Sequence, residues 1–260
     1  MRATFFNAKN YTKLRLNPVE ILTSRTNPKP CHYFSLFPFE VSELKVTFEE
    51  KITDMKLRIE DLDDESRFRH ILTVSYNDIA PFVFDYLRRK TAVTLTFWSF
   101  CLVFLGLALI IRINISGYFA WAKIFSHTLL GTILLPVAVV PLHEFMHAIP
   151  FLATGAKNIR AGMDLRQFIF YVTVHRKVIS RGTFIIVASI PFIVVSAVLL
   201  FLIYNLPGLW KWSLSLFLFV HTTMCAGDFA MLNLYFINRK KKILSWDDAD
   251  KKEAYFYEEF

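Results

Sequence analysis

The chain has 260 residues, 54% of them hydrophobic, and a mean hydropathy of +0.38, which is typical of an integral membrane protein rather than a soluble one. Its net charge of +8 could suit nucleic-acid binding, but the basic residues cluster beside apolar stretches. This placement indicates membrane topology and contact with anionic lipid headgroups, so nucleic acid is not an expected partner. The three cysteines have no CxxC spacing, and neither a disulfide framework nor a separate zinc module is expected.

Residues 1–90 precede the first long apolar stretch and are expected to form a cytosolic segment, mixed but mainly helical. Apolar residues recur at helical spacing from Phe48 to Leu62, although the alternation over residues 46–52 also fits a strand. A second helix is expected to begin near Asn77 and to lead into the membrane. The segment has no apolar core of the signal-peptide type, so we expect the first span to direct insertion.

Four apolar stretches each approach the length of about 20 residues that a membrane span requires. They cover about residues 92–111, 127–152, 183–204 and 214–237. Basic residues gather before the first, between the second and third, and after the fourth, which predicts that both termini are cytoplasmic. We therefore expect an all-α, multi-pass membrane protein, with four transmembrane helices and a short β-hairpin-like loop. Its domains would be a segment 1–90, a membrane domain 91–242 and a cytosolic acidic and aromatic tail 243–260.

Residues 143–147 read His-Glu-Phe-Met-His inside the second apolar stretch. Positions i and i+4 lie on one face of a helix, so His143 and His147 can present two imidazoles to one metal ion. Glu144 then lies beside that metal, where it can take a proton from an attacking water. Ionisable residues are costly in hydrocarbon and are usually functional there, so we favour this interpretation over a pair of hydrogen-bonded core histidines.

The loop after this motif contains a run from Gln167 to His175 that is rich in aromatic and β-branched residues, which predicts a strand. Such a strand could offer an edge on which an unwound substrate segment pairs near Tyr171. A hairpin that only covers the site explains the pattern equally well. Pro141 and Pro150 flank the motif and should kink its helix or end it nearby.

A catalytic zinc needs three protein ligands and one open position. The fourth stretch holds one acidic residue, Asp228, which lies about 15 Å from the basic end at ~1.5 Å per residue, the same depth as His147. We therefore expect Asp228 to be the third Zn²⁺ ligand, with Gly227 letting the helices approach closely. His221 lies about two turns away, ~10 Å, too far for this metal unless the helix is broken. It could bind substrate or an oxyanion, but an interhelical hydrogen bond is preferred, and Cys225 is a rival ligand or, as we prefer, a packing residue.

The HEFMH motif, Gly155, a basic loop with strand character, Pro191 and the CAGDF sequence together resemble a bacterial family of zincin peptidases of unknown function. That family is similar to the site-2 proteases, which cut inside membranes, and the resemblance covers about residues 92–242. It implies zinc as the cofactor, two histidines and one aspartate as ligands, and a glutamate as catalytic acid/base: His143, His147, Asp228 and Glu144. Site-2 proteases carry an Asn-Pro-Asp-Gly-like or Leu-Asp-Gly element, whereas here Gly227 precedes the aspartate and no Asn stands before it to bind substrate backbone.

The leading hypothesis is an intramembrane zinc metallopeptidase that hydrolyses peptide bonds in or near the membrane helices of a protein or peptide substrate. The substrate must unwind locally, because helical peptide bonds are sterically closed to attack. The alternative is a membrane scaffold or sensor that binds a metal without hydrolysis. A metal carrier is disfavoured, since transporters usually contain repeats or several polar spans.

Overall fold

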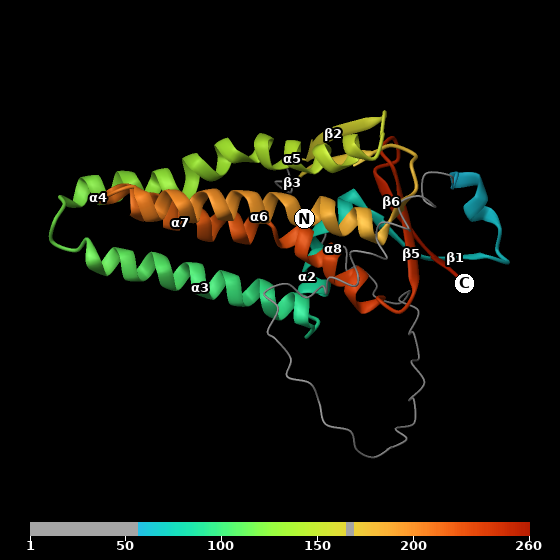
Figure 1. The fold of residues 1–260 in the computed structure, drawn as a ribbon, viewed down its shortest axis with the longest axis horizontal. Helices are drawn as coiled ribbons and strands as arrows, with labels where there is room; N and C mark the ends of the chain where they lie inside the picture. Colours follow the sequence, from blue (N-terminus) through green and yellow to red (C-terminus); the bar gives the residue numbers. More distant parts are fainter. Residues whose placement is uncertain (1–56, 165–168) are drawn as a thin grey trace, which may run out of the picture. The chain divides into compact units, whose positions relative to one another are not determined.

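The structure is a computed structural model, and it describes residues 57–164 and 169–260 of the chain (Figure 1). The predicted helix from Phe48 to Leu62 lies largely outside these residues, and its described end contains a short 3-10 helix, η1 (Ile59–Asp63). The second predicted helix is present as α2 (Ile79–Arg88). It is separated from the first span by a short break at which Thr91 caps the following helix through the amide of Thr94.

Three long apolar helices correspond to the first three predicted spans. They are α3 (Ala92–Asn114), a continuous helix over Trp121–Ala153, and α6 (Arg181–Asn205). The middle one consists of α4 (Trp121–Leu129), a π-helical turn η3 (Leu130–Leu134) and α5 (Leu135–Ala153). Each of the three is long and apolar enough to cross a membrane. The second helix ends at Ala153, three residues after Pro150, as the prolines predicted.

The fourth predicted span is a broken helix. Its halves, α7 (Leu209–Met224) and α8 (Ala226–Ile237), meet at Cys225 and are bent by 44°. The described residues therefore contain three candidate spans, or four if the bent pair counts as one, which supports a multi-pass membrane protein. The bend matters for the site because it changes the direction of the chain between His221 and Asp228.

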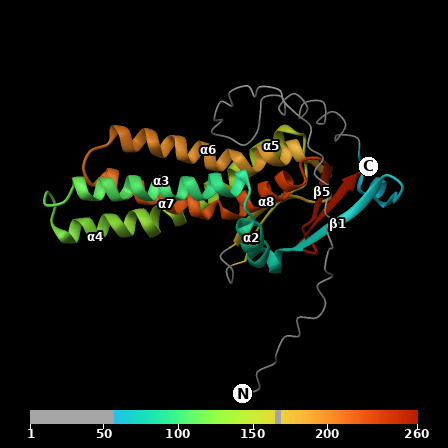
Figure 2. The same cartoon turned by 90° about the horizontal axis from the view of Figure 1, so that it is seen from below.

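The helices lie side by side, with α7 packed against α3 and α6, and with α5 packed against α6 (Figures 1 and 2). Their shared core is rich in aromatic residues around Phe229, whose ring lies 5.1 Å from that of Phe97 and 5.2 Å from that of Phe192. These contacts join α8 to α3 and α6 immediately after Asp228. The aromatic core therefore holds the first turn of α8 in place.

A four-stranded antiparallel sheet lies beyond one end of the helices and was not predicted (Figures 1 and 2). In spatial order its strands are β1 (Phe68–Ser75), β6 (Glu253–Glu259), β5 (Lys242–Asp248) and β4 (Ile179–Ser180). The acidic and aromatic tail thus forms a hairpin, β5–β6, in which alternate residues of β6 are buried. Its partner β1 comes from the segment before the first span, so the all-α description is too narrow.

A second, two-stranded sheet confirms the strand predicted in the loop after the motif. It pairs β2 (Ile159–Asp164) with β3 (Ile169–Val174) in antiparallel register, with Gly162 opposite Tyr171. Both strands contact α5, the helix that carries the HEFMH motif. The hairpin is therefore attached to the motif helix and does not stand apart from it.

Candidate metal centre

The HEFMH motif lies in the middle of α5, between Pro141 and Pro150. His143 and His147 are both buried, and their Nε2 atoms lie 3.2 Å apart. The spacing of four residues places the two rings on one face, as the sequence predicted. Glu144 is only partly buried, and its carboxylate and one nitrogen of each histidine lie within 4.8 Å of one another.

Asp228 lies in the first turn of α8, directly after the break in the helix. Its Oδ2 is 3.4 Å from Nε2 of His143, and its Oδ1 is 3.5 Å from Nε2 of His147. A carboxylate at this position also benefits from the positive end of the helix dipole. The structure thus brings together the three residues that the depth comparison predicted to meet.

The distances among these three side chains suit a zinc ion. Ligand atoms about 2.0–2.1 Å from a tetrahedral Zn²⁺ are separated by about 3.3 Å. The two Nε2 atoms are 3.2 Å apart, and each lies at a similar distance from one carboxylate oxygen of Asp228, 3.4 Å to Oδ2 for His143 and 3.5 Å to Oδ1 for His147. Two imidazole nitrogens and a carboxylate leave the fourth position open, as in catalytic zinc sites. The donor set therefore fits the metal that the motif predicts.

The second ring nitrogen of His147 fixes the orientation of that ring. Nδ1 lies 2.9 Å from the backbone carbonyl oxygen of Val187 on α6. Because a carbonyl only accepts hydrogen bonds, Nδ1 must carry the proton. In the neutral ring the lone pair is then on Nε2, the nitrogen that lies near Asp228 and His143. A partner of this kind commonly orients a metal-ligating histidine.

His221 lies much closer to the site than a straight helix would place it. Its Nε2 is 3.2 Å from Nδ1 of His143, because α7 ends at Met224 and the chain bends before Asp228. The predicted interhelical hydrogen bond is present. The ring is fully buried, which does not favour the substrate-binding role also considered for it. Cys225 is buried as well, with its Sγ 4.0 Å from Nε2 of His221.

Gly227 does not serve the close helix packing expected of it. A Cβ atom built at Gly227 would meet nothing within 4 Å in the described part of the chain. The close approach occurs instead at Gly131 in η3, where a Cβ atom would lie 2.2 Å from the carbonyl oxygen of Ser213 on α7. The sequence reasoning missed Gly131, and the open space beside Gly227 lies next to the carboxylate-bearing turn of α8.

The Tyr171 side chain packs within the protein. Its ring lies over Gly162, where an added Cβ atom would come within 2.3 Å of it, and 4.6 Å from the ring of Tyr76. The side chain thus joins the hairpin to the segment that follows β1. Pairing of an extended substrate with the backbone of this strand does not depend on the Tyr171 side chain, and it stays a prediction.

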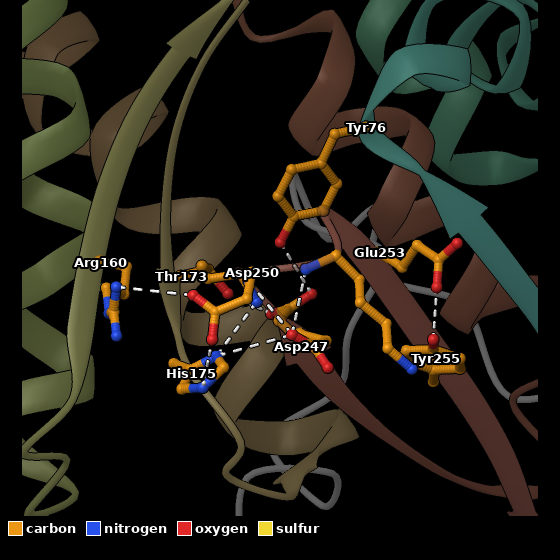
Figure 3. A network of polar contacts seen from close by, with 11 residues as sticks. Tyr76, Arg160, Thr173, His175, Asp247, Asp250, Glu253 and Tyr255 are labelled. Carbon is orange, nitrogen blue, oxygen red and sulfur yellow. Dashed lines mark hydrogen bonds and ion pairs between the residues drawn. The ribbon is translucent and has the colours of Figure 1, made fainter.

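A second polar network lies between the hairpin and the four-stranded sheet (Figure 3). Its centre is Asp247 on β5, which accepts a hydrogen bond from the Thr173 hydroxyl and another, of 3.3 Å, from the Tyr76 hydroxyl. Burial raises the pKa of the Asp247 carboxyl to about 6, against the opposing effect of these hydrogen bonds. The network ties β3 to β5, and so ties the hairpin to the sheet.

His175 belongs to the same region. Its Nε2 lies 3.5 Å from Asp250, which also faces Arg160 at 3.7 Å (Figure 3). His175, Asp248 and Asp250 are close enough together to hold a cation. However, Nδ1 of His175 accepts a hydrogen bond from the amide of Ala249. Oδ1 of Asp248 accepts hydrogen bonds from two amides of its own turn, so both of these atoms are already engaged.

The comparisons with known proteins agree with the motif. Searches of the curated proteins and of the solved structures found no match to this chain. A family described as "Putative zincin peptidase" matches residues 136–243, a region that begins in α5 before the HEFMH motif and ends in β5. The region includes α6, the hairpin and the broken helix with Asp228. Residues 136–243 thus match the zincin peptidase family that the HEFMH and CAGDF sequences were seen to resemble.

Proposed function

We propose that the protein is an intramembrane zinc metallopeptidase with His143, His147 and Asp228 as ligands and Glu144 as the catalytic acid/base. The observation that carries the proposal is the convergence of three side chains: the Nε2 atoms of His143 and His147 lie 3.2 Å apart, and each lies 3.4–3.5 Å from a different carboxylate oxygen of Asp228. Glu144 lies beside the two histidines. The family match supports a metallopeptidase, and the long apolar helices support a location in the membrane.

In the proposed reaction, a zinc ion, when bound, supplies Lewis-acid polarisation of the scissile carbonyl. Glu144 takes a proton from the attacking water and later delivers it to the leaving amine. His143 and His147 would bind the metal through Nε2, while the Nδ1 proton of each ring is directed to another acceptor in the protein. Asp228 would add negative charge. The Asp228 side chain is 19% exposed, so this side of the site is open to the surroundings of the protein.

The proposed substrate is a membrane protein or peptide with a segment that unwinds near the site. The hairpin β2–β3 contacts α5, so an extended segment paired with its edge would run close to the HEFMH motif. A model substrate with N-methyl groups on single backbone nitrogens tests this. Pairing predicts that cleavage is lost at every second position, whereas equal cleavage of all N-methylated substrates would exclude it.

We propose further that both termini face the cytoplasm and that the flanking basic residues contact anionic lipid headgroups. The support is the basic residues before α3, between α5 and α6, and after α8. Reporter domains fused at either end measure the orientation. An active periplasmic reporter at both ends would contradict it.

The first test of the proposed function is the metal content of the protein purified without chelators. We expect about one zinc per chain in the wild type and in Glu144→Gln, and little in His143→Ala or Asp228→Ala. Asp247→Asn is the matched control, because it changes a hydrogen-bonded carboxylate outside the site and should retain the zinc. Wild-type protein without metal would contradict the proposal. Zinc in a protein whose cellular effect survives Glu144→Gln would favour the non-hydrolytic scaffold or sensor instead.

A further inference from the structure

His221 contacts His143 at Nδ1, the ring nitrogen that does not face His147 and Asp228. It is fully buried on α7, with its Nε2 3.2 Å from Nδ1 of His143 and the two ring centres 5.3 Å apart. No other side chain among the described residues is recorded in a hydrogen bond with Nδ1 of His143. The orientation of this proposed ligand therefore depends on a side chain, whereas the orientation of His147 depends on the backbone of Val187.

The position of the protons follows from what each ring must do. If Nε2 of His143 presents a lone pair to a cation, the neutral ring carries its proton on Nδ1. That proton points to His221, so Nε2 of His221 must be the acceptor and the proton of His221 must be on Nδ1. The opposite assignment would put a proton on Nε2 of His143 and close that atom to a metal.

The required tautomer places the proton of His221 on Nδ1, so the surroundings of that nitrogen matter. Nδ1 of His221 is buried and has no hydrogen-bond partner among the residues that the structure describes. A buried N–H without a partner is unfavourable, and such groups in proteins call for an explanation. In the tautomer assigned here this N–H stays unsatisfied, and the hydrogen bond that Nε2 of His221 accepts from His143 has to offset that cost.

We propose that His221 is a positioning residue for the metal centre, which accepts the Nδ1 proton of His143 and so holds the Nε2 lone pair of that ring towards the metal. The inference rests on the proposed metal site and deepens it. His221 does not touch the metal or the substrate. Its effect passes through His143, as with other outer partners of metal-ligating histidines.

Two amide variants separate this role from simple packing. His221→Gln places a side-chain oxygen near the position of Nε2, within reach of His143, whereas the amide of His221→Asn is one methylene shorter and does not reach it. His221→Leu fills the space but has no acceptor. We expect the dissociation constant for zinc, measured against a competing chelator, to rise about 10–100-fold in the Asn and Leu variants and to stay near the wild-type value in Gln.

A second measurement reports ligand geometry independently of activity. Protein loaded with Co²⁺ gives a visible absorption spectrum that depends on the arrangement of the ligands. We expect this spectrum to change in His221→Asn and to return in His221→Gln. If the Leu variant does not fold, the Gln and Asn pair still decides the question, because both side chains are polar amides.

The inference is overturned if Asn binds zinc as tightly as Gln with the same cobalt spectrum, or if all three variants are weakened equally. It also fails if Cys225→Ala loses as much zinc affinity as His221→Leu, since His143, His221 and Cys225 would then act as a ligand set of their own. Wild-type protein without zinc overturns the proposed function together with this inference. Zinc that is lost in His143→Ala but unaffected in every His221 variant overturns this inference alone.

Discussion

Asp228 and Asp247 are two carboxylates held among protein atoms in different surroundings. Asp247 receives hydrogen bonds from two hydroxyl groups, those of Thr173 and Tyr76 (Figure 3). Asp228 faces two ring nitrogens, those of His143 and His147, at 3.4 and 3.5 Å. Hydroxyl donors satisfy the first carboxylate, whereas the second faces the two ring nitrogens that are its proposed partners in binding a metal.

The difference shows why one site suits a cation and the other does not. Acceptors that converge repel one another unless a positive charge lies between them, and a bound metal removes that repulsion. Asp247 needs no such charge, and its burial is relieved by a raised pKa and by hydrogen bonds. A carboxylate is therefore best judged by the groups around it, rather than by its burial alone.

The largest expected effect is on the cleavage rate, and it distinguishes the site around Asp228 from the network around Asp247. Glu144→Gln should lower the cleavage rate of a membrane-embedded substrate about 10²–10⁴-fold, the usual contribution of a general acid or base. Zinc content should not change, because the substituted group is not a proposed ligand. Asp247→Asn, assayed in the same proteoliposomes, should cleave at nearly the wild-type rate. Full activity in Glu144→Gln would show that another group handles the proton.

The cluster of His143, His147 and Asp228 could be anticipated from the sequence, because spacing and depth are read directly from it. Spacing of four residues within one helix brings His143 and His147 together, and distance from the basic boundary places Asp228 at matching depth. The position of His221 could not be anticipated, because it depends on the break at Cys225, where the sequence has no proline. Gly227, two residues after Cys225, is a local signal of a break, but a glycine in an apolar helix equally predicts close packing between helices.

The four-stranded sheet was missed for a different reason. Arg69 on β1 pairs with Glu258 on β6, at a separation of 189 residues, and no local pattern reveals a partner so distant. The strand β6 did carry a local signal, since Ala254, Phe256 and Glu258 are buried in alternation with more exposed residues. The charged ends of that run made it resemble a tail. The apolar spans were predictable because length and composition alone define them.

The next effect concerns stability and pH at Asp247. Its folded pKa of about 6 lies above the ordinary value of about 3.9, so the folded protein holds this proton more tightly than the unfolded chain does. The carboxyl therefore costs nothing below about pH 4, and its cost grows as pH rises to about 6, where it approaches about 3 kcal/mol. The unfolding free energy of the wild type, relative to Asp247→Asn, should fall across this window and stay level above it.

Unfolding of both proteins in detergent, followed between about pH 4 and pH 7, measures this difference. The comparison with Asp247→Asn cancels other groups that titrate in the same range. Parallel pH profiles for the two proteins would show that Asp247 stays charged when folded. The contrast with Asp228 would then rest only on the groups that face each carboxylate.

The smallest expected effect compares two glycines, one in each region. An added Cβ at Gly162 would come within 2.3 Å of the Tyr171 ring, which is itself held against Tyr76, so Gly162→Ala should destabilise the hairpin by about 1–3 kcal/mol. Gly227→Ala meets no neighbour within 4 Å in the described residues, and should leave both the unfolding temperature and the zinc content unchanged. Thermal unfolding and elemental analysis of the two variants test this. A loss at Gly227 as large as that at Gly162 would mean that the space beside Asp228 is filled in the membrane-embedded protein. A substrate would then have to approach the Asp228 carboxylate from another side.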